Sequence, residues 1–327
     1  MNVVFSSILK DEIASFIEFV KLSVVDYKAY QRTLYDFDSF LHSEELAEKK
    51  LDARQIERWL DGFDIHPLTK KSKLTHVRKF AGYLSALGID TSVPELPRTH
   101  SDFVPYVFSS DEMARIFEAA DDLMLTNPRS RTAAELPMLL RILYGCGLRY
   151  GEATSLTWND IDLSSGVITI KNAKNNKQRL IPMDEELTRI LKLYRTSPCC
   201  EADDSSLLFK TNDGKPRTSG TYRDPFNGIL CDLRIINPQT KKNGSRGPCI
   251  HSLRHTFTMQ SLIKAETEGK SFLETVPFLS TYLGHAGLME TDKYLKVRHE
   301  LYTESHATIA DYISDVLPDD VLSGEDM

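Results

Sequence analysis

The sequence HSLRH at residues 251–255, followed by LGH at 283–285 and then by Tyr294, decides how the rest of the chain is interpreted. His251 and Arg254 lie three residues apart, so a helix that begins after the preceding Gly-Pro pair places both on one face. Arginine offers a planar fork of permanently charged donors, and histidine can donate or transfer a proton near neutral pH. Such a cluster suits a phosphate, so we expect the partner to be a phosphodiester.

Length and composition indicate a protein with two domains. The chain has 327 residues, of which 41% are hydrophobic and 27% are charged, so it can bury two cores and has an ordinary globular composition. No apolar run approaches the ~18 to 20 residues of a membrane span, and residues 1–10 lack the pattern of a signal peptide. We therefore expect a cytoplasmic protein with no membrane partner.

The cysteine and histidine patterns argue against metal and disulfide chemistry. The chain has five cysteines and no Cys-x-x-Cys pair, which suits neither a disulfide framework nor a four-cysteine zinc site. His251 and His255 have the i, i+4 spacing of zinc ligands, but the zinc-protease pattern needs Glu beside the first His, and this chain has Ser252 there. We expect no metal and no other cofactor.

The net charge of −7 is unusual for a protein that binds a polyanion, but most of the excess lies at one end of the chain. The rest of the chain is nearly neutral, because the C-terminal tail holds these acidic residues and no basic one: Asp315, Asp319, Asp320, Glu325 and Asp326.

Basic side chains gather in three clusters, each of which could contact nucleic-acid phosphates or simply face solvent. The clusters lie within residues 70–79, 171–179 and 241–246. In the first and third clusters we expect nucleic-acid contacts from Lys70, Lys71, Lys73, Arg78, Lys79, Lys241 and Lys242.

The first 98 residues are predicted to form a helical domain. Apolar residues recur at helical spacing in 11–24 and 26–41, a third helix follows the N-cap candidate Asp52, and a fourth covers 69–87. This last helix carries the first basic cluster. A DNA-binding domain fits this pattern, although a protein-interaction bundle would look the same.

A proline-rich break separates this domain from the rest. Pro94, Pro97 and Pro105 fall within a short irregular stretch, which favours an extended connection. We place a linker at 99–107, a second domain at 108–305, and a C-terminal helix with an acidic tail at 306–327.

The second domain is predicted to be mainly helical with a small β-sheet. Short strands are expected at 167–170 and 179–182, joined by a polar connection. Helices are expected from a capping box at Ser109 onward and at 133–144, 185–194, 221–233, 253–264 and 272–283.

Two basic residues in this domain stand at positions where function and structure give competing readings. Arg149 lies at a glycine-flanked helix start, where backbone amides favour an anion, and the helix is expected to continue through Leu156 and Trp158. A surface arginine paired with Glu152 would show the same pattern. Lys174, in the strand connection, could reach a phosphate or could simply be solvated.

Taken together, these motifs resemble the tyrosine recombinases, also called phage integrases. The set comprises GLRYGE around Arg149, the connection lysine Lys174, HSLRH, LGH and Tyr294, in the order typical of that family. The segment WNDID at 158–162 also reads like the family's own, and the phrase at 279–285 is similar to integrases of mobile elements.

The resemblance implies a fold, a partner and an assembly. Residues 1–98 would be a SAM-like core-binding domain, followed by a mixed α/β catalytic domain, the two forming a C-shaped clamp on double-stranded DNA. Four identical protomers would act on two DNA sites through a Holliday junction, with accessory DNA-binding proteins as further candidate partners.

The chemistry points to Tyr294 as the nucleophile. A phenol can store the energy of a phosphodiester bond as a covalent ester without a metal, and the resemblance implies a 3′-phosphotyrosine. Arg149 and Arg254 would stabilise the charge that grows on the phosphate oxygens in the transition state.

The remaining polar residues supply protons and support. Lys174, or alternatively Lys177, would protonate the leaving 5′-oxygen. His251 would assist proton transfer at the tyrosine, and His285 would donate to the scissile phosphate. Glu152 would orient the basic residues without contacting the phosphate, and His255 would support the site structurally.

Two other functions remain as alternatives. A DNA-relaxing enzyme of the topoisomerase IB kind shares the covalent step, and an architectural DNA-binding protein could keep the fold without catalysis. Formation of a synapse between two specific DNA sites would distinguish a recombinase from both.

Overall fold

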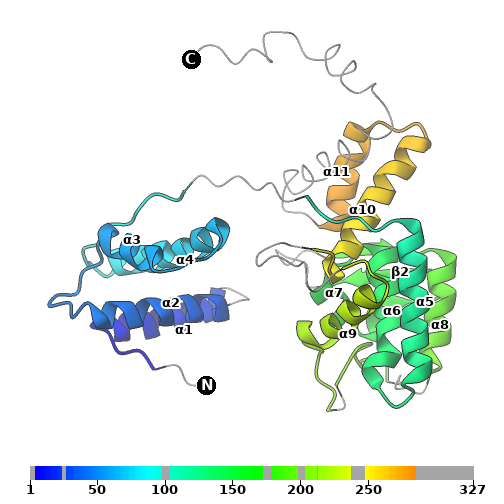
Figure 1. Ribbon diagram of the computed structural model, residues 1–327, viewed down its shortest axis with the longest axis horizontal. Coiled ribbons are helices and arrows are strands. Elements are labelled where there is room, and N and C mark those ends of the chain that lie inside the picture. The colour runs from blue at the N-terminus through cyan, green and yellow to red at the C-terminus, as the bar shows by residue number, and fades with distance from the viewer. Residues whose placement is uncertain are drawn as a thin grey trace, which may run out of the picture. The chain divides into compact units, whose positions relative to one another are not determined.

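The computed structural model describes residues 4–23, 27–97, 104–171, 178–197, 203–211, 213–236 and 247–284. The chain divides into two compact units, Met1–Asp102 and Phe103–Met327, and each is described by itself. Both are built mainly of helices, and the second also holds a small sheet (Figure 1). The predicted fold class, mainly helical with a small β-sheet, is confirmed.

The described part of the first unit contains helices in the four predicted ranges. Leu34, Phe37 and Phe80 are fully buried in its core, where aromatic side chains pack at close range. The fourth helix begins two residues earlier than predicted because a proline fits the first helical position, where no backbone donor is needed. The bounds are α1 (Lys10–Ser23), α2 (Tyr27–Ser43), α3 (Ala53–Asp61) and α4 (Pro67–Ala86).

The second unit is organised around one buried helix, α6. It packs against α5, α8, α9 and α10, and its residues Leu139, Leu140 and Ile142 are fully buried. The bounds of the long helices are α5 (Ser110–Thr126), α6 (Arg131–Cys146), α8 (Glu185–Arg195), α9 (Ser219–Asp232), α10 (Ile250–Thr267) and α11 (Phe272–Leu283).

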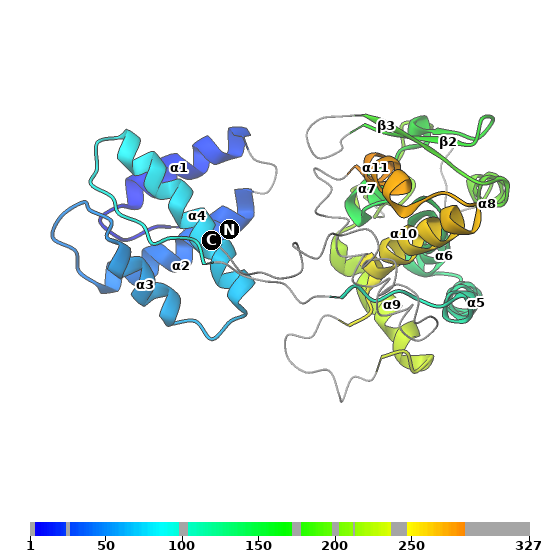
Figure 2. The same ribbon diagram turned by 90° about the horizontal axis from the view of Figure 1, so that it is seen from above.

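A three-stranded antiparallel sheet lies at one edge of this unit, beside α7 (Tyr150–Thr154) and α11 (Figure 2). The strands β2 (Val167–Ile170) and β3 (Arg179–Pro182) have the predicted bounds, and Ile170 pairs with Arg179 at the end of their ladder. The third strand, β1 (Ile161–Asp162), was not predicted, because two residues give no periodic signal.

The predicted helix through Leu156 and Trp158 is wrong. Helix α7 (Tyr150–Thr154) is a single short element, and a 3₁₀ turn, η1 (Trp158–Asp160), follows it. The Leu156 carbonyl accepts from the backbone N–H of Leu208 at 2.9 Å, and the Trp158 N–H donates to the Ser206 carbonyl at 3.2 Å. These backbone groups pair with a distant segment, so they are not available to continue a helix.

Part of the predicted linker packs against the second unit. Val104 and Val107 contact the cluster formed by α10 and α11, and Tyr106 contacts the main core. Directly after them, the Phe108 N–H donates to Thr256 Oγ1 at 2.9 Å. These residues therefore fix the start of α5 next to α10.

Among the described residues, none of the helices is both long and apolar enough to cross a membrane.

Candidate active site

Helix α10 presents the HSLRH sequence in its first turns. It begins at Ile250, soon after the Gly-Pro pair and three residues before the predicted range 253–264, because the Cys249 N–H donates to Ser252 Oγ at 3.1 Å and closes a cap. Arg254 is buried, with 2% of its surface exposed, whereas His251 is exposed. Helical spacing placed the two on one face, but their depths differ.

Arg254 joins the ends of two helices. Its Nη1 donates to the Gly147 carbonyl at the end of α6 at 2.7 Å, and its Nη2 donates to the Leu283 carbonyl at the end of α11 at 2.8 Å. The final carbonyls of a helix lack partners in the helix and carry partial negative charge, so they suit a guanidinium. The bonds therefore fix the orientation of Arg254 from two sides.

Arg149 reaches the same end of α11 from the other direction. It caps α7, and its Nη2 donates to the Gly284 carbonyl at 2.8 Å. Its backbone N–H and Nη1 donate to the two carboxylate oxygens of Glu152 at 2.8 and 3.0 Å. The sequence predicted that backbone amides at this helix start favour a bound anion. In the structure the Arg149 amide donates to the Glu152 carboxylate instead.

Two glycines make this convergence sterically feasible. Gly147 (φ 60°) and Gly284 (φ 66°) both cap a helix in the left-handed conformation that disfavours side chains. A Cβ on Gly147 would lie 2.3 Å from a ring carbon of Phe257, and one on Gly284 would lie 3.1 Å from Arg179 Nη1. A side chain at Gly147 would therefore clash with Phe257, and one at Gly284 would displace the Arg179 guanidinium by a few tenths of an ångström.

Arg179 completes the cluster and was not predicted to take part in it. Its Nη1 and Nη2 donate to the two oxygens of Glu152 at 3.0 and 2.8 Å, and its Nε donates to the Tyr282 carbonyl at 2.9 Å. The sequence placed it in a basic cluster and at the start of a predicted strand. Its position directly after the connection that holds Lys174 was the one available signal.

The environment of Glu152 keeps its carboxylate charged. Burial alone would raise the pKa of Glu152, but the hydrogen bonds from Arg179 and from the Arg149 backbone, together with both positive charges, outweigh burial and lower the pKa. The Glu152 side chain is 8% exposed and that of Arg179 is 12% exposed. The pair is therefore well shielded from solvent.

The two histidines of α10 contact each other. His255 is buried, and its ring meets that of His251 edge to face, with 4.7 Å between ring centroids. The predicted structural role of His255 stays a prediction. The predicted residues Lys174, Lys177, Lys241, Lys242, His285 and Tyr294 lie outside the described residues.

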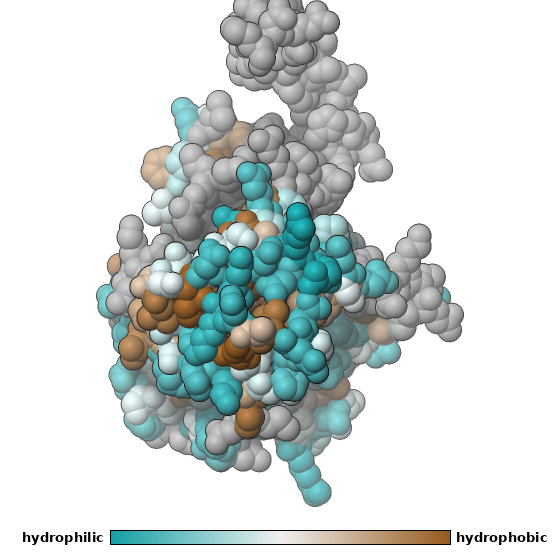
Figure 3. Space-filling view, turned by 90° about the vertical axis from the view of Figure 1, so that its left-hand side faces the viewer, coloured by the Kyte–Doolittle hydropathy of each residue, from teal (hydrophilic) through white to brown (hydrophobic). Residues whose placement is uncertain are grey.

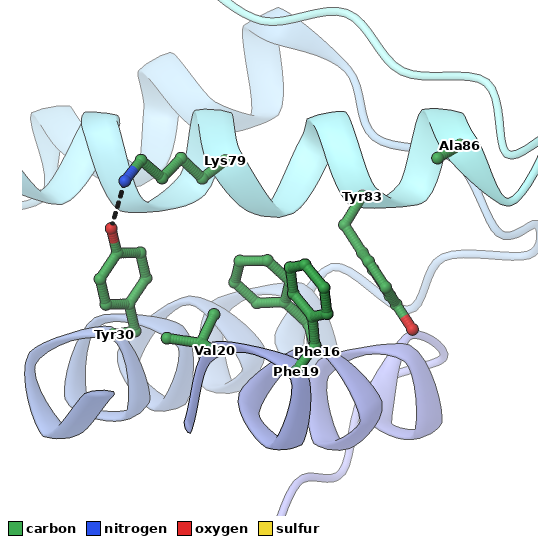
Figure 4. A pocket seen from close by; sticks show the side chains of 7 residues that line it. All are labelled: Phe16, Phe19, Val20, Tyr30, Lys79, Tyr83 and Ala86. Atoms are coloured by element: carbon green, nitrogen blue, oxygen red, sulfur yellow. Dashed lines mark hydrogen bonds between the residues drawn. The ribbon is translucent and has the colours of Figure 1, made fainter. Parts of the chain in front are cut away.

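The predicted DNA-binding side chains on α4 already make contacts within the first unit. Lys73 pairs with Asp36 at 2.6 Å, and Arg78 donates to the Pro94 carbonyl. Lys79 donates to the Tyr30 hydroxyl at 2.9 Å, at the rim of an apolar groove of about 390 Å³ between α1 and α4 (Figure 4). Lys70 and Lys71 are partly exposed. DNA contacts by this cluster stay a prediction.

One face of the molecule is mixed in character. Among the coloured side chains in Figure 3, hydrophilic ones lie around smaller hydrophobic patches. Among the described residues, no group of three or more His, Cys, Asp or Glu side chains is arranged to hold a metal ion.

Comparison with known proteins identifies the family to which this chain belongs. Residues 107–300 match the profile of the phage integrase family. The chain belongs to the phage integrase family. It is therefore a tyrosine recombinase, an enzyme of site-specific DNA recombination.

Individual relatives extend this match over most of the recombinase. A putative integrase/recombinase, y4rB of Sinorhizobium fredii, is 30% identical over 72% of this chain and 76% of its own length. The tyrosine recombinase XerC of Staphylococcus carnosus is 28% identical over 85% of this chain and 90% of its own length. A lambda integrase tetramer bound to a Holliday junction has a similar fold, with a TM-score of 0.60 and 15% identity over 86% of this chain and 78% of that chain.

The Glu152 carboxylate should make the stability of the second unit depend on pH. Its folded-state pKa lies below the unfolded value of about 4.3, so its stabilisation is complete above that value and is lost as the pH falls through the folded pKa. We expect Glu152→Gln to lower the free energy of unfolding by about 2 kcal/mol at pH 7 and by progressively less as the pH falls below about 4.3.

Urea unfolding in a Trp59→Phe background would measure this, because Trp158 is then the only tryptophan and lies buried in the second unit. Glu186→Gln on α8 is the matched control, since its pair with Arg189 is exposed and should contribute little to stability at any pH. A loss in Glu152→Gln that does not change with pH would contradict the assignment.

Proposed function

We propose that this recombinase cleaves DNA with Tyr294 as the nucleophile, at a phosphate held by Arg149 and Arg254. One observation carries the proposal: both arginines are oriented by the carbonyls of Leu283 and Gly284, directly before His285 in the sequence. Tyr294 follows nine residues later. The two guanidiniums thus bind the residues directly before the segment that leads to the proposed nucleophile.

The reaction divides into attack and departure. The Tyr294 phenol attacks the scissile phosphorus, forms a 3′-phosphotyrosine, and expels the 5′-oxygen of the other DNA segment. Arg149 and Arg254 offset the charge that grows on the non-bridging oxygens, and His285 donates a further hydrogen bond. Rejoining is the reverse attack by a 5′-hydroxyl.

Proton transfer accompanies both steps. Lys174, with Lys177 as the alternative, gives a proton to the leaving 5′-oxygen, which is otherwise a poor leaving group. His251, exposed at the start of α10, assists removal of the phenol proton. No step requires a metal or another cofactor.

The assembly is a further part of the proposal. The tetrameric relative on a Holliday junction supports four protomers acting on two double-stranded DNA sites. We place the enzyme in the cytoplasm, as the integrase of a mobile element, with accessory DNA-binding proteins as candidate partners. No observation favours a relaxing enzyme or a silent DNA-binding protein.

Tyr294→Phe should abolish the covalent adduct and leave DNA affinity within a few-fold, because the ring stays and only the nucleophilic oxygen is lost. Covalent capture from a pool of nicked random-sequence duplexes would measure this and would also reveal the target site. Tyr282→Phe is the control: the Tyr282 hydroxyl donates to the Cys146 carbonyl at 3.3 Å, and burial raises its pKa. Adduct that persists in Tyr294→Phe but disappears in Tyr282→Phe or Tyr302→Phe would refute the assignment.

Arg149→Ala and Arg254→Ala should each slow cleavage of pre-bound DNA by roughly 100-fold or more, equivalent to ~3 kcal/mol of transition-state stabilisation. Because Arg254 also joins two helix ends, Arg254→Lys provides a variant that keeps charge and volume. Single-turnover cleavage with and without chelator is the measurement, and chelator should change nothing. A loss explained entirely by weaker binding would reduce both arginines to ordinary phosphate contacts.

Removal of residues 306–327 should prevent assembly of the synaptic complex but allow binding to a single site. The segment lies outside the described residues, but Ile309, Tyr312, Ile313 and Val316 have helical spacing, which suits docking on a neighbouring protomer. Analytical ultracentrifugation on DNA with two target sites would test this. An unchanged tetramer after truncation would show that the segment folds on its own domain or has no part in assembly.

A further inference from the structure

Arg179 occupies the point where three parts of the catalytic unit meet. It is the first residue of β3 and pairs with the last residue of β2, so its backbone closes the ladder at the root of the 171–178 connection. Its side chain lies mostly buried and donates three hydrogen bonds to residues of α7 and α11. One residue thus links the sheet to both helices.

Each bond of Arg179 reaches a neighbour of a proposed catalytic group. The two bonds to Glu152 hold the carboxylate that in turn binds the Arg149 backbone and guanidinium. The bond to the Tyr282 carbonyl holds α11 two residues before the Gly284 carbonyl that accepts from Arg149. The backbone of Arg179 lies five residues after Lys174 in the sequence.

The geometry of these bonds requires a guanidinium. Arginine presents donors in a rigid plane, so two can engage both oxygens of one carboxylate while Nε engages a third acceptor. A lysine ammonium is a single charged centre on a flexible stem and cannot span both carboxylate oxygens with the same fixed orientation. Charge alone would therefore not reproduce the contacts.

We propose that Arg179 is a positioning residue for DNA cleavage, which acts through Glu152 and the Tyr282 carbonyl without contacting the phosphate. The inference rests on the proposed function for the identity of the groups that it positions. It orients Arg149 through the shared carboxylate, and it fixes the sheet end from which the connection with Lys174 departs. The other reading of Arg179, as one member of a basic DNA-contacting cluster, predicts a loss of affinity instead.

Cleavage kinetics on pre-bound DNA separate these two roles. Arg179→Ala and Arg179→Lys should both slow formation of the covalent adduct by about 10- to 100-fold, with DNA affinity within about three-fold of the wild type. Arg189→Ala removes a bidentate arginine–glutamate pair on the exposed face of α8 and should leave the rate unchanged. Full activity in Arg179→Lys would show that charge suffices and would overturn the proposal, as would a defect confined to affinity.

A double-mutant cycle tests the route through Glu152. If Arg179 acts on Arg149 by way of the shared carboxylate, the two substitutions should not add. The cleavage rate of the Glu152→Ala, Arg179→Ala double variant should then lie within about three-fold of the rate of the slower single variant. Independent roles would multiply the two defects, and that result would refute the route.

A modified substrate tests the link to the proton donor. Replacing the bridging 5′-oxygen with sulfur gives a leaving group that departs as a thiolate and hardly needs a proton, since thiols have a pKa of about 8.5. The defect of Arg179→Ala should shrink by about ten-fold on this substrate, whereas that of Arg149→Ala should not. A general loss of folding would reduce the rates on both substrates equally. A defect of Arg179→Ala that is just as large on the sulfur substrate would show that Arg179 does not position the proton donor.

Hydrogen exchange provides a readout that does not depend on activity. In the full-length protein without DNA, Arg179→Ala should speed amide exchange at least ten-fold in peptides covering 149–154, 179–182 and 282–284, and Arg189→Ala should not. If the wild type forms no adduct with any DNA but exchange responds in this way, the proposed function fails and the positioning network stands. Unchanged exchange together with wild-type cleavage in Arg179→Ala would overturn the positioning role and leave the proposed function intact.

Discussion

The catalytic unit depends on the Glu152 carboxylate, which two guanidiniums share. Arg149 and Arg179 approach each other closely around Gly284, and their like charges would repel without a carboxylate between them. A buried carboxylate without partners would in turn be costly, so each charge requires the others. This mutual dependence holds α7, β3 and the end of α11 in one arrangement, with positive charge in excess for an incoming phosphate.

The backbone contributes as much to this arrangement as the side chains do. Helices α6 and α11 both end on a left-handed glycine, and the carbonyls at these ends accept from Arg254 and Arg149. Carbonyls at helix ends are partly negative and have no partner in the helix, so they orient a cation without neutralising it. These carbonyls thereby help to hold both arginines in fixed orientations.

The sequence predicted elements whose signals are local. The strands β2 and β3 and the helix α11 have the expected bounds, and the N-cap at Asp52 and the capping box at Ser109 mark helix starts as expected. The sequence could not predict hydrogen bonds between residues that lie far apart along the chain. The continuation of α7 was wrong because backbone groups near Leu156 and Trp158 bond to residues more than forty positions away.

The same limit applies to the geometry of the candidate site. Arg149 and Arg254 were identified from motifs and lie close together, but their orientation by carbonyls of α6 and α11 depends on tertiary packing. Helical spacing could not show that Arg254 is buried while His251 is exposed. Arg179 was missed because its partners, Glu152 and Tyr282, lie 27 and 103 residues away. The catalytic roles of Arg149, Lys174, His251, Arg254, His285 and Tyr294 all stay predictions.

The most direct test of this account is a structure of the enzyme trapped on DNA as its covalent intermediate. We expect the phosphorus to be bonded to Tyr294 Oη, with Arg149 and Arg254 each donating to a phosphate oxygen at about 2.7 to 3.0 Å, while Arg149 keeps its bonds to Glu152. A phosphate bonded to another residue, or one that either arginine does not reach, would contradict the account.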